Sequence, residues 1–151
     1  MNKPFFSIVM PVYNRVEFLQ RSISSVLNQQ FPDFELWCID DGSTDNSKEL
    51  IIKFQEKDPR IHLIELKENK GRCIARNKGI EKAQADWICF LDADDIYREN
   101  HLQVIRDLIK RHAKQLAFAT EQTIGGQPKI YARKKHIRFF AEITIDYLIY
   151  L

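Results

Sequence analysis

Residues 87–95 read Trp-Ile-Cys-Phe-Leu-Asp-Ala-Asp-Asp, an apolar run followed directly by a cluster of carboxylates. The run is typical of a buried strand. Carboxylates are rarely buried without a partner, and a divalent cation compensates the cost of desolvating them. We therefore expect Asp92 and Asp94 to hold Mg²⁺ or Mn²⁺ beside a diphosphate. The alternative is a turn in which the same aspartates cap the next helix.

A second acidic turn follows another apolar run. Residues 34–39 read Phe-Glu-Leu-Trp-Cys-Ile, and residues 40–45 continue as Asp-Asp-Gly-Ser-Thr-Asp. If the sheet is parallel, both acidic turns lie at its carboxyl edge, where open α/β sheets bind ligands. Gly42 allows a tight turn, and Ser43, Thr44 or Asp45 can cap the helix that follows. A plain strand-to-helix turn without a ligand is the alternative.

Strands and helices alternate along the first 113 residues. The patterns predict strands at 7–13, 34–39, 61–66 and 87–91, and helices after Asn14 and at 46–57, 72–84 and 99–113. Asn14 and Glu17 resemble a capping box at the start of the first helix. The alternation predicts an α/β fold with a mainly parallel sheet.

The last part of the chain has a weaker pattern. Residues 116–120 and 130–132 read as strands, and residues 124–129, with two glycines and a proline, read as the turn between them. Residues 142–151 fit a strand and a helix equally well by periodicity. We expect residues 1–120 to form the core and residues 121–151 to form a hairpin and a final segment of the same domain.

Four motifs in order give the chain a resemblance to family 2 glycosyltransferases. They are Pro-Val-Tyr-Asn at 11–14, Ile-Asp-Asp-Gly-Ser-Thr-Asp at 39–45, Asn-Lys-Gly at 69–71 with Ala-Arg-Asn-Lys-Gly at 75–79, and Phe-Leu-Asp-Ala-Asp-Asp at 90–95. The resemblance implies the GT-A fold, a Rossmann-like three-layer α/β/α architecture. It also implies a metal-dependent, inverting transferase that uses a nucleotide-sugar donor, most often a UDP-sugar, in the synthesis of cell-surface polysaccharides or other glycans.

The resemblance assigns the nucleobase pocket to the first two strand ends. Pro11 and Tyr13 would line this pocket, and Asp41 would accept the imide hydrogen of uracil, with Asp40 assisting from the same turn. A buried acceptor discriminates well, because a base without the matching donor would leave the carboxylate unpaired.

The remaining motifs would contact the ribose, the diphosphate and the metal. Asp92 would bind the ribose or a metal-bound water, Asp94 would be the direct metal ligand, and Asp95 is a weaker candidate for a substrate contact. Arg72 and Arg76 would face uracil or phosphate oxygens from the start of a helix. The alternative for both arginines is a solvated helix face.

The catalytic base does not have a candidate in this reading. In the resembled family it is an Asp or Glu in an acceptor-binding half downstream of the metal motif, so we expect it beyond Leu151. Glu142 and Asp146 are the only late carboxylates, and we expect both at an ordinary surface. The chain therefore reads as a C-terminally truncated nucleotide-sugar-binding half, and the resemblance favours a helix over residues 142–151 that leads toward the missing acceptor half. A non-catalytic nucleotide-sugar-binding module is the alternative, and uncovered apolar surface near residues 139–151 would favour self-association.

Composition narrows the classes of partner and compartment. The net charge of +2 gives no support to nucleic-acid binding, and the basic residues within 129–138 form either a solvated surface or a contact for anionic lipids or a lipid-linked glycan acceptor. Three cysteines without a Cys-x-x-Cys pair suit the cytoplasm, and scattered histidines lack metal-ligand spacing. No segment reads as a leader or membrane span, so membrane contact would be peripheral, at the inner face.

Rival enzyme classes lack their motifs. The chain has neither the Gly-x-Gly-x-x-Gly of dinucleotide-dependent oxidoreductases nor the Gly-x-x-x-x-Gly-Lys-Ser/Thr of P-loop nucleotidases. An aspartyl phosphatase also uses Asp-x-Asp, but Ile96 and Tyr97 supply no accompanying threonine.

Overall fold

The computed structural model describes residues 3–112, 123–124, 127–128 and 138–139. The central sheet contains β1 (Phe6–Val12), β2 (Phe34–Asp40), β3 (Ile61–Glu65), β4 (Trp87–Phe90) and β7 (Arg138–Phe139), in the order β3-β2-β1-β4-β7. Every pairing within it is parallel. The predicted α/β fold with a mainly parallel sheet is therefore confirmed.

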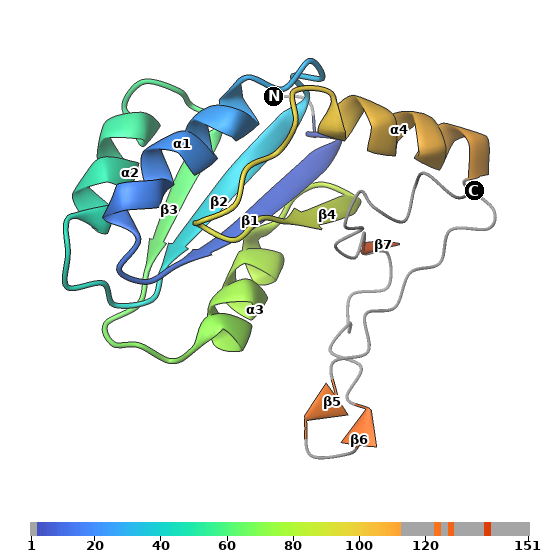
Figure 1. Ribbon diagram of the computed structural model, residues 1–151. Helices are drawn as coiled ribbons and strands as arrows, with labels where there is room; N and C mark the ends of the chain where they lie inside the picture. The colour runs from blue at the N-terminus through green and yellow to red at the C-terminus, as the bar shows by residue number, and fades with distance from the viewer. Residues whose placement is uncertain (1–2, 113–122, 125–126, 129–137, 140–151) are drawn as a thin grey trace.

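Among the described residues, four helices connect and cover the strands: α1 (Val16–Leu27), α2 (Ser47–Gln55), α3 (Arg72–Lys82) and α4 (His101–His112). The helices α2, α3 and α4 lie within their predicted ranges, shortened at one or both ends, and α1 follows Asn14 as predicted. For α3 the reason is local, because Ala83 leaves the helical conformation with a ψ of 130°. Figure 1 shows α1, α2 and α4 above the sheet and α3 below it, which makes the three layers of the predicted architecture.

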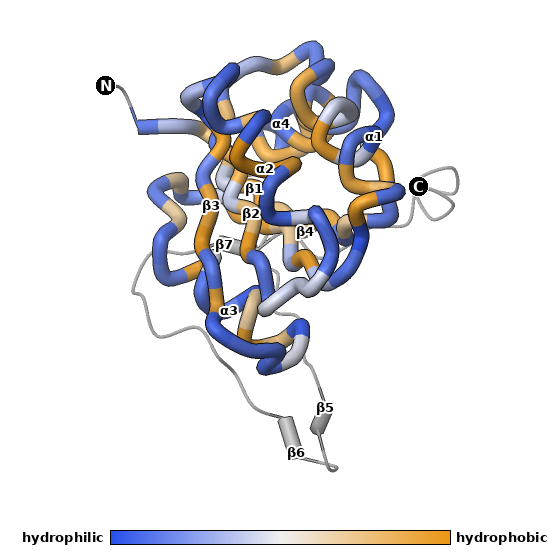
Figure 2. The backbone as a smooth tube through the Cα atoms, turned by 90° about the vertical axis from the view of Figure 1, so that its left-hand side faces the viewer, coloured by the Kyte–Doolittle hydropathy of each residue, from blue (hydrophilic) through white to orange (hydrophobic). Residues whose placement is uncertain are grey.

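Each face of the sheet has its own apolar core. Residues of β1 that point upward, such as Ile8 and Met10, share a buried cluster with Leu19 of α1 and Leu102 of α4. Val9 points the other way and packs with Ile39, Ile88 and Ala75 of α3 between the sheet and that helix. This alternation is the strand period of two, applied to a sheet that is covered on both sides. In Figure 2 the hydrophobic segments accordingly run through the central strands.

The later part of the chain differs from its predicted pattern where it is described. Thr123–Ile124 (β5) pairs antiparallel with Gln127–Pro128 (β6), so strand pairing extends into the range predicted as turn. Arg138 and Phe139, which lie outside the predicted strands, form β7 beside β4. The predicted strands at 116–120 and 130–132 and the segment 142–151, with Glu142 and Asp146, lie outside the described residues. None of the described helices is both long enough and apolar enough to cross a bilayer.

Candidate functional site

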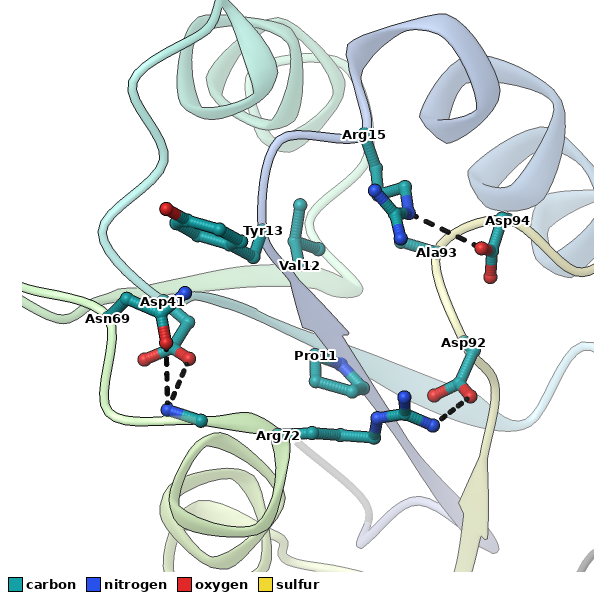
Figure 3. A pocket seen from close by; sticks show the side chains of 11 residues that line it. Pro11, Val12, Tyr13, Arg15, Asp41, Asn69, Arg72, Asp92, Ala93 and Asp94 are labelled. Atoms are coloured by element: carbon teal, nitrogen blue, oxygen red, sulfur yellow. Dashed lines mark hydrogen bonds and ion pairs between the residues drawn. The ribbon is translucent and has the colours of Figure 1, made fainter.

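A pocket of about 250 Å³ opens at the carboxyl edge of the sheet. Its walls come from the ends of β1, β2 and β4 and from the loop that leads into α3. The lining residues are Pro11, Val12, Tyr13, Arg15, Asp41, Asn69, Gly71, Arg72, Asp92, Ala93 and Asp94. Figure 3 shows Asp41 on one side of this pocket and Asp92 and Asp94 on the other, so the two acidic turns do face a common space.

Asp41 is buried and already holds the loop before α3. Its two carboxylate oxygens accept hydrogen bonds from the backbone amides of Lys70 and Gly71, each over 2.8 Å. Charge-assisted bonds of this kind are short and strong, and they fix the amino end of α3 against the end of β2. Gly42 makes the turn possible, because its φ is +72° and a Cβ there would lie 2.7 Å from the carbonyl carbon of Glu68. The predicted role of Gly42 is confirmed.

Asp92 sits between two arginines of α3. Nη2 of Arg76 donates to Oδ1 over 2.8 Å, and Nη1 of Arg72 donates to Oδ2 over 3.3 Å. The Arg76 guanidinium also lies over the ring of Phe90, 5.1 Å from its centroid, and its Nε is buried without a hydrogen-bond partner. Arg72 is much more exposed, at 65%, so it can turn toward a ligand while Arg76 keeps Asp92 in place.

Asp94 is the most open carboxylate of the pocket. Its side chain is 47% exposed, and Oδ2 accepts a hydrogen bond from Nε of Arg15 over 3.3 Å. The contact joins the first strand-to-helix turn to the last one in Figure 3. Arg21, six residues after Arg15 in α1, reaches only the backbone carbonyl oxygen of Asp94, over 3.5 Å.

Asn14 joins two turns instead of capping its own helix. Its side-chain oxygen accepts hydrogen bonds from the amides of Thr44 and Asp45, over 2.8 and 3.3 Å. The predicted capping box with Glu17 is wrong, because the N-cap position of α1 is Arg15 and no side chain of that residue caps the helix. Asn14 has a φ of 50°, a left-handed conformation that Asn tolerates better than most residues, and this turns its side chain toward the neighbouring loop.

The first amides of α1 receive their partners from the loop before α2. The amide of Arg15 donates to Oγ of Ser47 over 3.0 Å, and the amide of Val16 donates to Asp45 over 3.1 Å. The other oxygen of Asp45 accepts from the amide of Ser47, the first residue of α2, over 2.9 Å. The N-cap position of α2 is Asn46, whose side chain makes no capping bond. Burial by itself would raise the pKa of Asp45, but these hydrogen bonds from Ser47 and Val16 lower it. We call this set of contacts, together with those of Asn14, the α1–α2 latch.

The pocket collects six of the eight residues assigned to the site by sequence: Pro11, Tyr13, Asp41, Arg72, Asp92 and Asp94. Asp40 is not among the lining residues. It is 2% exposed and accepts from the amide of Ser43, and burial raises the pKa of its carboxyl group. Arg76 lies behind Asp92, and Asp95 is exposed outside the lining.

Sequence reasoning missed Arg15 as a site residue. It follows the first strand by only three positions, so the rule that ligands bind beyond the carboxyl ends of parallel strands already covered it. Asn69 and Gly71 also line the pocket, and both belong to a motif noted in the sequence without a role. Their position follows from the bonds that Asp41 makes to this loop.

Asp92 and Asp94, in the turn after β4, have the chemistry of a hard-cation site. Asp94 offers an exposed oxygen pair with one cationic contact, whereas both oxygens of Asp92 are held by arginines. Within the residues that the structure describes, no three His, Cys, Asp or Glu side chains gather as a metal site. Mg²⁺ and Mn²⁺ at nucleotide sites commonly use one or two carboxylates together with phosphates and water. Asp94 therefore fits the role of direct ligand, and Asp92 fits a contact to the ribose or to a metal-bound water.

Sequence comparison places the chain among glycosyltransferases. The family model described as "Glycosyl transferase family 2" matches residues 7–150. A glycosyltransferase from Haemophilus influenzae is 48% identical over 103 residues, covering 68% of this chain and 41% of the relative. TuaG of Bacillus subtilis, a glycosyltransferase assigned to teichuronic acid biosynthesis, is 36% identical over 121 residues, covering 80% and 44%. The chain thus spans less than half the length of these two relatives.

Solved structures share the same fold. TarS of S. aureus in complex with UDP superposes with a TM-score of 0.68 at 28% identity, covering 72% of this chain and 33% of TarS. Its complex with UDP-GlcNAc gives a TM-score of 0.69. A mannosyltransferase of Pyrobaculum calidifontis, solved with GDP-mannose and Mn²⁺, gives a TM-score of 0.61 at 23% identity and covers 78% of this chain and 33% of its own. The last likeness is one of fold alone.

Proposed function

The chain belongs to glycosyl transferase family 2, and we propose that its pocket binds a UDP-sugar with a divalent cation for transfer to a glycan acceptor of the cell surface. The observation that carries the proposal is the meeting of Tyr13, Asp41 and Asp94, from three separate strand ends, in one pocket. The likeness to TarS, which was solved with UDP and UDP-GlcNAc, supports the donor. The relative TuaG supports a cell-surface product.

The nucleobase would lie on the side of the pocket formed by the ends of β1 and β2. Tyr13 is 41% exposed and offers a ring face for stacking, and Pro11 lines the same pocket. Asp41 is buried and anchored by two amides, so its remaining lone pairs are held in a fixed direction. A uracil imide hydrogen directed at this carboxylate would be recognised strongly, because a base without that donor would leave the buried charge incompletely paired.

The diphosphate would lie between α3 and the acidic turn of β4. The two amides before α3 are taken by Asp41, so we assign phosphate binding at this helix end to the exposed guanidinium of Arg72, which would turn from its 3.3 Å contact with Asp92 to phosphate oxygens. Asp94 would hold the cation, with Asp92 beside it. When bound, the cation would stabilise the negative charge that develops on the departing diphosphate. We propose an inverting reaction, in which a base on the opposite face of the sugar deprotonates the acceptor.

A second candidate is a module that binds the nucleotide-sugar without transfer. Each carboxylate that lines the pocket already has partners: Asp41 has two amides, Asp92 has two arginines and Asp94 has Arg15. Among the described residues that line it, the pocket therefore presents no uncommitted carboxylate as a base. Release of UDP from UDP-GlcNAc in the presence of acceptor preparations separates the two candidates, because a binding module would bind the donor and leave it intact.

The deciding experiment is calorimetric titration of UDP, GDP and dTDP into the protein with and without Mn²⁺. We expect UDP to bind most tightly and Mn²⁺ to increase its affinity about tenfold or more, because the cation screens the repulsion between the diphosphate and the carboxylates. Asp94→Ala should remove most of the Mn²⁺-dependent gain and leave metal-free UDP binding largely intact.

Asp95→Ala is the matched control. Asp95 directly follows Asp94 in the sequence, is exposed and does not line the pocket. The variant should therefore bind UDP and Mn²⁺ as the wild type does. Failure of all three nucleotides to bind, with and without metal, would remove the proposal.

A further inference from the structure

The guanidinium of Arg15 stands between two of the turns that form the pocket. Nε donates to Oδ2 of Asp94 over 3.3 Å, and Nη1 donates to the carbonyl oxygen of Asn14 over 3.1 Å. Arg15 and Asp94 are 79 positions apart in the chain, so only the parallel sheet brings them together. The contact gives the carboxylate assigned to the metal an internal cation.

The backbone of Arg15 is held firmly, whereas its side chain is open. The amide of Arg15 is bonded to Ser47 and the next amide to Asp45, so the α1–α2 latch fixes where the side chain starts. The side chain itself is 46% exposed, and its partner Asp94 is 47% exposed. The guanidinium can therefore change partner within the pocket without any movement of the helix.

We propose that Arg15 is a positioning residue that neutralises Asp94 in the free protein and turns to the diphosphate when nucleotide and metal bind together. The inference rests on the proposed function of the pocket. A guanidinium and a divalent cation repel each other, so one carboxylate oxygen does not serve both well. The diphosphate supplies a new anionic partner close to the same place, and guanidinium groups bind phosphate oxygens readily.

Coupling between metal and nucleotide follows from this exchange. A metal that binds without nucleotide must displace Arg15 from Asp94 and leave it without an anionic partner. With UDP present, the displaced guanidinium has the diphosphate to bind. Each ligand therefore strengthens the binding of the other, and by linkage both effects have the same size. The ion pair is half exposed, so its share of the coupling is a few-fold and not orders of magnitude.

The test is binding of Mn²⁺ alone to the full chain, followed by electron paramagnetic resonance, in the wild type and in Arg15→Gln. We expect Arg15→Gln to bind Mn²⁺ about two- to fivefold more tightly, because the competing cation is gone. In calorimetry, saturating Mn²⁺ should increase the affinity for UDP in both proteins. The increase should be smaller in Arg15→Gln than in the wild type, by about two- to fivefold or more. Arg15→Lys keeps the charge and should lie between the two proteins in both measurements.

Arg21→Gln is the matched control. It removes one positive charge from the same helix near the same turn, but Arg21 contacts only the backbone carbonyl oxygen of Asp94. The other contact of Arg21, 5.3 Å from the ring centroid of Phe18, lies within α1. The effect of Arg21→Gln on Mn²⁺ affinity should stay below about twofold, the range of screened surface charges. Equal tightening in both variants would overturn the inference in favour of general electrostatics.

Two further outcomes are separable. If Arg15→Gln binds Mn²⁺ like the wild type and keeps the full Mn²⁺-dependent gain in UDP affinity, the inference is overturned and the proposed function stands. If the wild type itself shows no Mn²⁺-dependent UDP binding, the proposed function fails and the role of Arg15 fails with it.

Discussion

Gly79 lies in the middle of α3, where its missing side chain lets the helix approach the sheet. A Cβ at this position would lie 2.5 Å from Cγ1 of Val9 and 2.8 Å from Cδ1 of Ile39. Both neighbours are fully buried, and Val9 is β-branched with little freedom to rotate. This close packing holds the second half of α3 against the sheet, while Asp41 holds the loop before it.

Gly79→Ala tests which of two opposed effects is larger. Alanine favours a helix over glycine by about 1 kcal/mol, whereas overpacking a rigid core costs about 1–3 kcal/mol. Because the contact is with the stiff side chain of Val9, we expect a net loss of about 1–2 kcal/mol in urea unfolding. Lys78→Ala, at an exposed position of the same helix, should change stability by less than about 0.5 kcal/mol. A stabilised Gly79→Ala protein would show that α3 can move away from the sheet at little cost.

The α1–α2 latch is a property of two elements and not of one. The loop before α2 caps α1 through Ser47 and Asp45, and Asn14 at the entry to α1 in turn accepts from the amides of Thr44 and Asp45. Asn14 of the latch lies between Tyr13 and Arg15 in the sequence, so its bonds help to fix where the side chains of Tyr13 and Arg15 start.

Asn14→Ala should loosen both helix entries. It leaves the amides of Thr44 and Asp45 without their acceptor and places alanine at a φ of 50°, so we expect a loss of about 1–3 kcal/mol in thermal or urea unfolding. Asn14→Asp keeps an acceptor and tolerates the same φ, and should lose less. In calorimetry, Asn14→Ala should also weaken UDP binding. Equal stability of the alanine and aspartate variants would argue against the latch.

At the scale of the whole molecule, His101 links stability to pH. Its ring stacks on Tyr97 at 4.0 Å, and burial lowers the pKa of His101 from 6.5 to about 4. Between these values the unfolded chain binds a proton that the folded protein excludes. The free energy of unfolding therefore falls as the pH falls through this window, and the stabilisation is fully present only above about pH 6.5.

His101→Phe should remove this part of the acid sensitivity while keeping an aromatic ring against Tyr97. The free energy of unfolding of the wild type should drop between pH 7 and pH 4 by on the order of 2 kcal/mol more than that of the variant, less than the full shift because His101 keeps some solvent contact. The measurement is urea unfolding at a series of pH values. Parallel curves for the two proteins would show that His101 does not titrate differently on unfolding.

Local pattern was sufficient for most of the fold. The parallel sheet was predicted from the apolar runs at 34–39 and 87–91 and from the amphipathic helices between them. A strand that is buried on both faces needs apolar residues at nearly every position, so it is visible in the sequence. The position of Asp41, Asp92 and Asp94 at the sheet edge followed, since each comes directly at a strand end. The role of Asn14 was misjudged for the opposite reason: its partner lies in another loop, 30 residues away.

The sequence alone was enough to determine the order of the elements, the edge at which the ligand groups gather and the chemical types of those groups. Only the tertiary structure decided which charged groups pair with one another: Asp92 with Arg72 and Arg76, Asp94 with Arg15, and Asp41 with the amides before α3. Helices and strands arise from neighbours along the chain, whereas these pairs form between turns that meet only after the parallel strands have aligned.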